Sequence, residues 1–126
     1  MKKTNLAFSE KLICERIERI YFQQLEQQLQ RINCRIFDRV LVLLLEGVIT
    51  PPENLLNRHN HPGLANKVRS VFDRIIQLQI KDAIEQTLNV TVTDFLCDTA
   101  IETGRTGAIV IFEFQSLGSS SGICDD

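Results

Sequence analysis

The sequence predicts an α+β fold, a single domain with a four-stranded, mostly antiparallel sheet packed with two long helices. Two segments place apolar residues three and four positions apart, which is typical of amphipathic helices. Four shorter segments are apolar or alternate apolar with polar residues, and they form two hairpin-like pairs, which favours antiparallel neighbours. A chain of 126 residues is about the size of one domain. The predicted order is α-β-β-α-β-β.

The first helix is expected over residues 9–29. Ser9 is a suitable N-cap, and Glu10 follows in the first turn, where the helix dipole favours a carboxylate. The polar face consists of Glu, Gln, Lys and Arg, so the helix should pack its apolar stripe on the sheet. The stripe and its continuation recur at spacings of one, three and four: Ile13, Ile17, Ile20, Tyr21, Leu25, Leu29 and Ile32.

The first hairpin is expected to pair residues 32–36 with residues 40–45. Apolar and polar residues alternate in the first strand, so this strand should be half exposed. The second strand is apolar at every position, which predicts an interior position with both faces covered. Helices would cover one face, and a second copy of the protein is the expected cover for the other.

The connection after this hairpin, LEGVITPPENLL at residues 45–56, is interpreted as a strand end that leads into a helical turn. Gly47 loosens the strand end. Thr50 is a good N-cap, and Glu53 stands three residues later, as in a capping box. Proline at the first helical position loses no hydrogen bond. The two prolines therefore start a helical turn, which should run to about Arg58.

The second long helix is expected over residues 64–88, where neither Gly nor Pro interrupts the pattern, and Asn89 should end it in a left-handed conformation. Two strands follow, at residues 90–97 and 108–114.

The segment DTAIETGRTG joins these strands, and Gly104 and Gly107 are interpreted as turn residues. The tail SLGSSSGICDD is rich in Gly and Ser, a composition typical of flexible linkers. We therefore divide the chain into one domain at residues 1–115 and a flexible tail at residues 116–126.

The composition excludes several classes of protein. Fourteen basic and sixteen acidic residues give a net charge of −2, which offers no reason to expect nucleic acid as a partner. The longest apolar run, residues 40–45, is far below the roughly 18 residues that a transmembrane helix needs. The N-terminus has no apolar signal core. We expect a cytoplasmic protein without a transmembrane segment, in which the cysteines are free thiols: Cys14, Cys34, Cys97 and Cys124.

Candidate chemical sites are few. His59 and His61 offer two imidazoles to a metal, but a structural zinc takes four ligands, so exposed loop histidines are favoured, and neither a metal nor a cofactor is expected. The buried-thiol interpretation is favoured for Cys34 and Cys97 because both lie in predicted strands. Four carboxylates near the last hairpin are expected to pair with Arg105 or to face solvent rather than to act as general acids and bases: Asp94, Asp98, Glu102 and Glu113.

Two segments carry a resemblance to a known family. Residues 40–56, VLVLLLEGVITPPENLL, resemble an apolar strand that ends in l-x-G-x-L-T-x-x-E-x-x-L, with Ile49 in place of Leu. Residues 92–114, VTDFLCDTAIETGRTGAIVIFEF, resemble a strand ending in S-D, a loop with T-G and a closing strand of the type I-V-F-x-L, with Cys97 in place of Ser. Together they are similar to the MpsC family, named for the third component of a sodium-translocating, membrane-potential-generating system. That family often has G-K-G-P before the first strand, where this chain has QQLQRI.

The resemblance implies a small accessory or regulatory protein, not an enzyme, that associates with a membrane complex coupling cation movement to membrane potential and, in related systems, to inorganic carbon uptake. It would lie at the inner face of the membrane through protein partners. A regulatory module that binds a small ligand or ion, and a thiol-based redox sensor, are the alternatives. The second apolar face of the sheet predicts a homodimer. The motif positions are binding candidates whose alternative role is capping and turn formation: Gly47, Thr50, Glu53, Asp98, Thr103 and Gly104.

Overall fold

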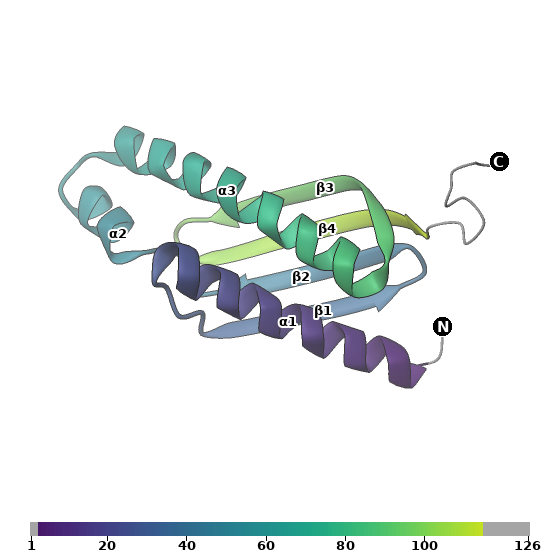
Figure 1. The fold of residues 1–126 in the computed structure, drawn as a ribbon. Coiled ribbons are helices and arrows are strands. Elements are labelled where there is room, and N and C mark those ends of the chain that lie inside the picture. The colour runs from purple at the N-terminus through teal and green to yellow at the C-terminus, as the bar shows by residue number, and fades with distance from the viewer. Residues whose placement is uncertain (1–2, 115–126) are drawn as a thin grey trace.

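The computed structural model describes residues 3–114 and confirms the α+β fold class (Figure 1). The predicted helical turn after the first hairpin is a helix of its own, so the order is α-β-β-α-α-β-β. The predicted flexible tail, with Cys124, lies outside the described residues. The elements are α1 (Lys3–Leu25), β1 (Arg31–Phe37), β2 (Val40–Glu46), α2 (Pro51–Arg58), α3 (Pro62–Leu88), β3 (Val90–Ala100) and β4 (Arg105–Phe114).

The four strands form one antiparallel sheet in the order β1-β2-β4-β3. The apolar strand β2 lies in the interior, as its composition predicts, with Leu43 opposite Cys34 on one side and opposite Ala108 on the other. Strands β1 and β3 form the two edges. A register shift between Val92 and Asp94 marks a bulge in β3.

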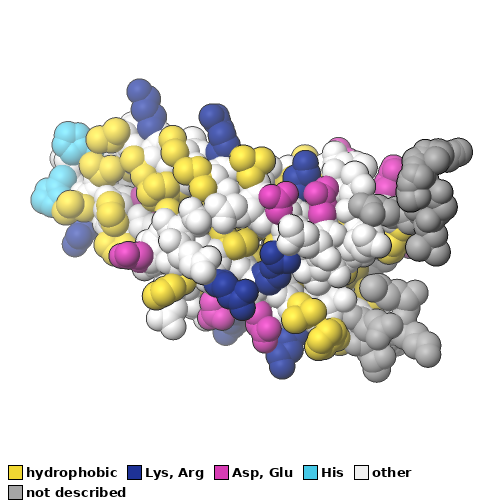
Figure 2. Space-filling model, viewed as in Figure 1, with side chains coloured by type: hydrophobic (Ala, Val, Ile, Leu, Met, Phe, Trp, Pro, Cys, Tyr) yellow, Lys and Arg dark blue, Asp and Glu magenta, His cyan; other side chains and the backbone are white. Residues whose placement is uncertain are grey.

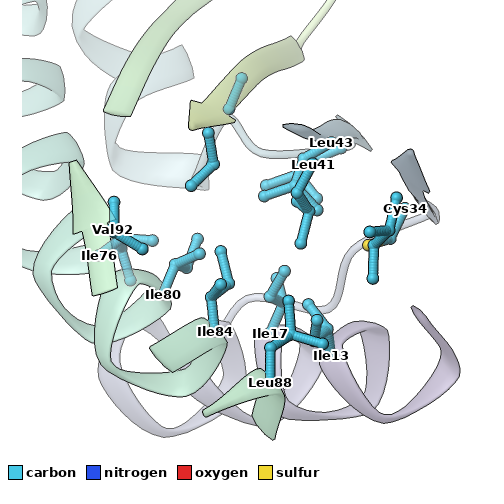
Figure 3. Close-up of a cluster of buried hydrophobic side chains, with 14 of the residues drawn as sticks. Ile13, Ile17, Cys34, Leu41, Leu43, Ile76, Ile80, Ile84, Leu88 and Val92 are labelled. Atoms are coloured by element: carbon cyan, nitrogen blue, oxygen red, sulfur yellow. The ribbon is translucent and has the colours of Figure 1, made fainter. Parts of the chain in front are cut away.

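Both long helices lie on the same face of the sheet (Figure 1). Side chains from α1, α3 and the inner face of the strands form one core (Figure 3). Successive side chains of β2 point to opposite faces of the sheet. Leu41, Leu43 and Leu45 are buried, so this set faces the core. The members of the core with the lowest exposure include Ile13, Ile17, Tyr21, Leu41, Val48, Ile84, Val90 and Val110.

The other face of the sheet is not covered by the described part of the chain. We call it the open sheet face. Its central residues alternate with those of the core, and several are exposed, including Leu44 at 37%, Ile109 at 46% and Leu96 at 58%. Its apolar members are Phe37, Val40, Val42, Leu44, Leu96, Ile109 and Ile111.

Helix α1 differs from its expected bounds. The prediction that Ser9 caps it is wrong, because the helix begins at Lys3 and Ser9 is a buried residue within it. Glu10 is therefore not in the first turn, and its carboxylate accepts a hydrogen bond from the Ile36 N–H at 2.8 Å. The helix ends before Leu29 because Glu26 adopts a positive φ of 52°, and its N–H donates to Phe22.

Helix α3 begins at Pro62 and ends as predicted, since Asn89 adopts a left-handed conformation with φ of 57°. Strands β3 and β4 are longer than expected and leave only residues 101–104 as a turn. The interpretation of Gly104 as a turn residue is confirmed by its φ of 70°. Gly107 is not a turn residue, because it lies within β4 and pairs with Leu44 and Asp98.

Candidate functional site

The two motif segments contact each other at one end of the sheet. The backbone N–H groups of Gly47 and Val48 both donate to the Gly104 carbonyl, at 3.0 and 3.1 Å. This pair of bonds links the connection after β2 to the turn before β4. Gly104 is buried, and a Cβ added to it would lie 3.6 Å from the Ile49 side chain.

Gly47 is required by geometry. Its φ is 82°, a conformation that favours glycine, and an added Cβ would lie 2.8 Å from Cγ of Gln30. The segment QQLQRI, residues 27–32, lies against this glycine. The Gln27 side-chain amide donates to the carbonyls of Gly47 at 2.8 Å and Ile49 at 3.3 Å. The segment that replaces G-K-G-P in this chain thus helps to hold the connection in place.

Thr50 and Glu53 form the predicted capping box at the start of α2. Both residues are buried, at 3% and 2% exposure. One carboxylate oxygen of Glu53 accepts hydrogen bonds from the Thr50 N–H at 3.0 Å and from the Thr50 hydroxyl at 2.9 Å. The charge of Glu53 therefore lies inside the protein, which is unfavourable without a cation nearby.

Arg69 of α3 supplies that cation, and sequence reasoning missed it. Its side chain is 6% exposed, and its Nε lies 3.4 Å from Glu53 and 3.3 Å from Asp73. Its Nη1 donates to the Val48 carbonyl at 3.2 Å, and the guanidinium stands 5.8 Å from the centre of the Phe72 ring. An arginine within an amphipathic helix is typical of a solvent-facing residue, so the pattern carried no signal for this role.

The Arg69 guanidinium is not fully satisfied. Within the described residues, Nε and Nη2 are buried and have no hydrogen-bond partner. The pKa of the Asp73 carboxyl is raised, mainly by burial and further by the nearby charges of Glu53 and Asp98, while Arg69 acts in the opposite direction. Because Glu53 and Arg69 are buried and Asp73 is partly buried, the cluster joins α2 to α3 and the strand end.

The other two motif residues are exposed. Asp98 accepts a hydrogen bond from the Thr99 N–H at 2.9 Å, and the Thr103 hydroxyl donates to the Ala100 carbonyl at 3.4 Å. Beside them, the hydroxyls of Thr99 and Thr106 lie 2.7 Å apart across the strand pair. The structure thus brings together Gly47, Thr50, Glu53 and Gly104, and it leaves Asp98 and Thr103 on the surface.

His59 and His61 are exposed at the junction of α2 and α3. Within residues 3–114, no group of three or more His, Cys, Asp or Glu side chains is arranged to hold a metal ion. Arg105 pairs with Glu46 at 3.7 Å, whereas the carboxylates of the last hairpin are exposed.

The cysteines in the described region are free. Cys34 is buried, as expected, but the expectation for Cys97 is wrong, because this residue of the edge strand β3 is exposed. Partial burial, together with Asp73 and Asp98, raises the pKa of the Cys97 thiol to about 11. The Cys14 thiol donates to the Ile32 carbonyl at 3.9 Å, and the neighbouring Cys14 thiol together with burial raises the pKa of Cys34.

A groove of about 520 Å³ lies between α3 and β3. Polar side chains of α3, among them Asp73, Arg74, Gln77 and Lys81, line one side of it, and residues 92–95 of β3 line the other. None of the six motif residues lines it. The groove meets the motif cluster at Asp73, which lines the groove and pairs with Arg69.

Comparison with known proteins gives one match. A family model described as "Na+-translocating membrane potential-generating system (MpsC)" matches residues 7–114. Searches of curated proteins and of solved structures gave no match. Among the described residues, no helix has both the length and the apolar character that crossing a membrane would require.

Proposed function

The chain belongs to the MpsC family, and on that premise we propose that it is an accessory subunit, without enzymatic activity, of a Na⁺-translocating system that generates membrane potential. It acts in the cytoplasm and reaches the inner face of the membrane through protein partners. The buried motif cluster supports this proposal, because Arg69 pairs with Glu53 and Asp73 and the cluster holds helices α2 and α3 together. Coupling to inorganic carbon uptake belongs to the same proposal.

The observation that carries the proposal is the open sheet face. Its apolar residues are contributed by all four strands, and Phe37, Leu96 and Ile109 are 56%, 58% and 46% exposed. Soluble monomers rarely expose a contiguous apolar surface of this kind, and such surfaces mark protein contacts. We assign this face to a second copy of the chain, which makes the protein a homodimer.

The charges at the rim of the open sheet face favour a particular arrangement of the two copies. The strand register aligns Arg35 of β1, Val42, Ile109 and Leu96 of β3 in one row across the sheet. Asp94 and Asp98 of β3 lie two residues to either side of Leu96. One edge is therefore basic and the other acidic.

A two-fold axis parallel to the strands, midway between β2 and β4, would lay β1 of one copy over β3 of the other. Arg35 would then lie between Asp94 of the partner subunit and Asp98 of the partner subunit, at the edge of an apolar interface. A two-fold axis in the plane of the interface but perpendicular to the strands would instead place Arg35 near Arg35 of the partner subunit. These like charges would repel. Among the described residues, Arg35, Asp94 and Asp98 form no ion pair within the chain, which leaves them available for this contact.

Light scattering coupled to size exclusion tests the homodimer. The protein should elute as a dimer at micromolar concentration, and Ile109→Lys, at the centre of the open sheet face, should elute as a folded monomer. Arg35→Glu should weaken the dimer by about tenfold in dissociation constant, and adding Asp94→Arg and Asp98→Arg should restore it. A wild-type chain that is a clean monomer without detergent would refute the dimer.

A gene deletion tests the accessory role. Loss of the gene should reduce Na⁺-dependent membrane potential, measured with a potential-sensitive dye in whole cells, and the wild-type gene should restore it. The Ile109→Lys variant, expressed at the same level, separates the role of the dimer from that of the chain. A deletion strain with unchanged membrane potential and unchanged tolerance of Na⁺ would contradict the proposal.

A further inference from the structure

Helix α3 carries a second apolar stripe, which does not contribute to the core. We call it the α3 seam, and it consists of Leu64, Val68, Val71, Ile75 and Leu78. Val68 is half buried, and the other four residues are 41% to 61% exposed. Figure 2 shows hydrophobic side chains gathered over α2 and the neighbouring half of α3.

The seam is distinct from the face of α3 that packs in the fold. Residues such as Ala65, Arg69, Ile76 and Ile80 face the core and are buried. On a helix with 3.6 residues per turn, these positions point to a side well away from the seam. Folding of the domain therefore does not use the seam.

The spacing of the seam indicates what kind of surface fits it. Its residues follow one another at intervals of four, three, four and three, an average of 3.5. That repeat is the pattern of a coiled-coil contact, in which each apolar side chain inserts between side chains of a facing helix. At a rise of about 1.5 Å per residue, the seam is about 21 Å long, which corresponds to about two heptads of a facing helix.

Three basic residues follow one side of the seam at intervals of seven: Lys67, Arg74 and Lys81. These are the positions that flank the contact in a coiled coil. On the other side, the corresponding positions are Phe72 and Gln79, which carry no charge, and Ala65, which is buried in the fold. Among the described residues, the three basic side chains form no ion pair.

We propose that the α3 seam docks an amphipathic helix of a different protein, with aliphatic residues at its seam positions and Asp or Glu along its flank. The basic edge supports this choice. In an antiparallel pair of α3 helices the two basic edges would face each other and repel, and in a parallel pair each would meet the uncharged edge. A second copy is therefore a poor match, whereas an acidic helix is complementary.

A membrane surface is a weaker match to the same residues. Helices that lie in a lipid interface present a broad apolar face that carries Trp, Phe or Leu. The α3 seam is narrow, and all five of its residues are aliphatic. The α3 seam lies with the helices, on the side of the sheet opposite the open sheet face (Figure 1), so both surfaces can be occupied at once. The proposal depends on this spacing and charge, so it stands apart from the accessory role.

The test uses two synthetic helices of about three heptads with leucine at the seam positions. One has glutamate at the flanking positions, and the matched control has lysine. Fluorescence anisotropy with the full chain should show the acidic peptide binding at least about tenfold more tightly than the basic one, with a preference that falls as salt rises. The charge-reversed variant K67E/R74E/K81E, with its fold checked by circular dichroism, should reverse the preference.

Three results would overturn the proposal. The first is equal binding, or no binding, of both peptides. The second is binding to vesicles that contain phosphatidylglycerol, but not to vesicles of phosphatidylcholine alone, in a chain that binds neither peptide, which would assign the seam to a membrane. The third is a change of oligomeric state in Ile75→Glu, which would assign the seam to a second copy.

Discussion

The two motif segments, which the sequence presents as equals, differ in burial. The connection that contains Gly47, Thr50 and Glu53 is enclosed, and its polar groups bond one another and Arg69. The turn after β3 exposes Thr103 and buries only Gly104, which accepts two hydrogen bonds from the first segment. The first motif segment is therefore a buried structural connection, and the second is a surface turn. Substitutions in each segment can test these two roles separately.

The largest effect is expected at Arg69. Replacing Arg69 with Met leaves the buried Glu53 carboxylate without its cation, which should lower the free energy of unfolding by about 3–5 kcal/mol, measured by urea denaturation. The double variant Arg69→Met with Glu53→Gln removes both charges and should recover part of the loss. If the free energy of unfolding of Arg69→Met lies within about 1 kcal/mol of the wild-type value, the ion pairs of Arg69 do not stabilise the contact between α2 and α3.

Gly47→Ala should have the next largest effect. The side chain would be forced into a positive φ of 82° and against Gln30, and the expected loss of stability is about 2 kcal/mol. Gly63→Ala is the matched control, because nothing lies within 4 Å of its added Cβ and α3 should gain up to about 1 kcal/mol. Equal melting temperatures for Gly47→Ala and Gly63→Ala would contradict the prediction that only position 47 requires glycine.

Thr50→Ala should cost about 1 kcal/mol, because the N-cap is lost and the Glu53 carboxylate loses one hydrogen bond. Thermal unfolding by circular dichroism measures the change. The prediction that this residue is structural fails if Thr50→Ala unfolds as the wild type does and yet no longer restores membrane potential in the deletion strain.

The smallest effect is expected at the surface turn. Thr103→Ala removes only a bond of 3.4 Å between exposed groups, so stability should stay within about 0.5 kcal/mol of the wild type. The same variant decides whether the turn has another role. If it folds normally but does not restore membrane potential, the turn contacts a partner. The first motif segment would then serve to stabilise the fold, and the turn would serve to recognise the partner.

The features that sequence predicted well depend on neighbouring residues. The Thr50 and Glu53 capping box and the left-handed Asn89 each follow from a few adjacent positions, and both are found. The interior place of β2 follows from its composition alone. Local physics was sufficient for these.

The features that sequence missed depend on contacts between distant segments. Ser9 has the chemistry of an N-cap, but α1 begins earlier and uses that position for packing. Arg69 is buried because Val48 and Glu53, from outside α3, supply its partners. Cys97 is exposed because β3 lies at an edge of the sheet, and the hairpin pattern does not specify strand order.

The order of the strands also has a consequence for how the chain folds. Each hairpin pairs neighbours in sequence, whereas β2 and β4 pair residues about 60 to 70 positions apart, as in Glu46 with Arg105 and Val40 with Ile111. The entropy cost of closing that long loop comes before the central pairing is formed, so we expect this step to limit the folding rate. Variants at the β2 and β4 contact should slow folding, whereas variants within the hairpin turns should mainly speed unfolding.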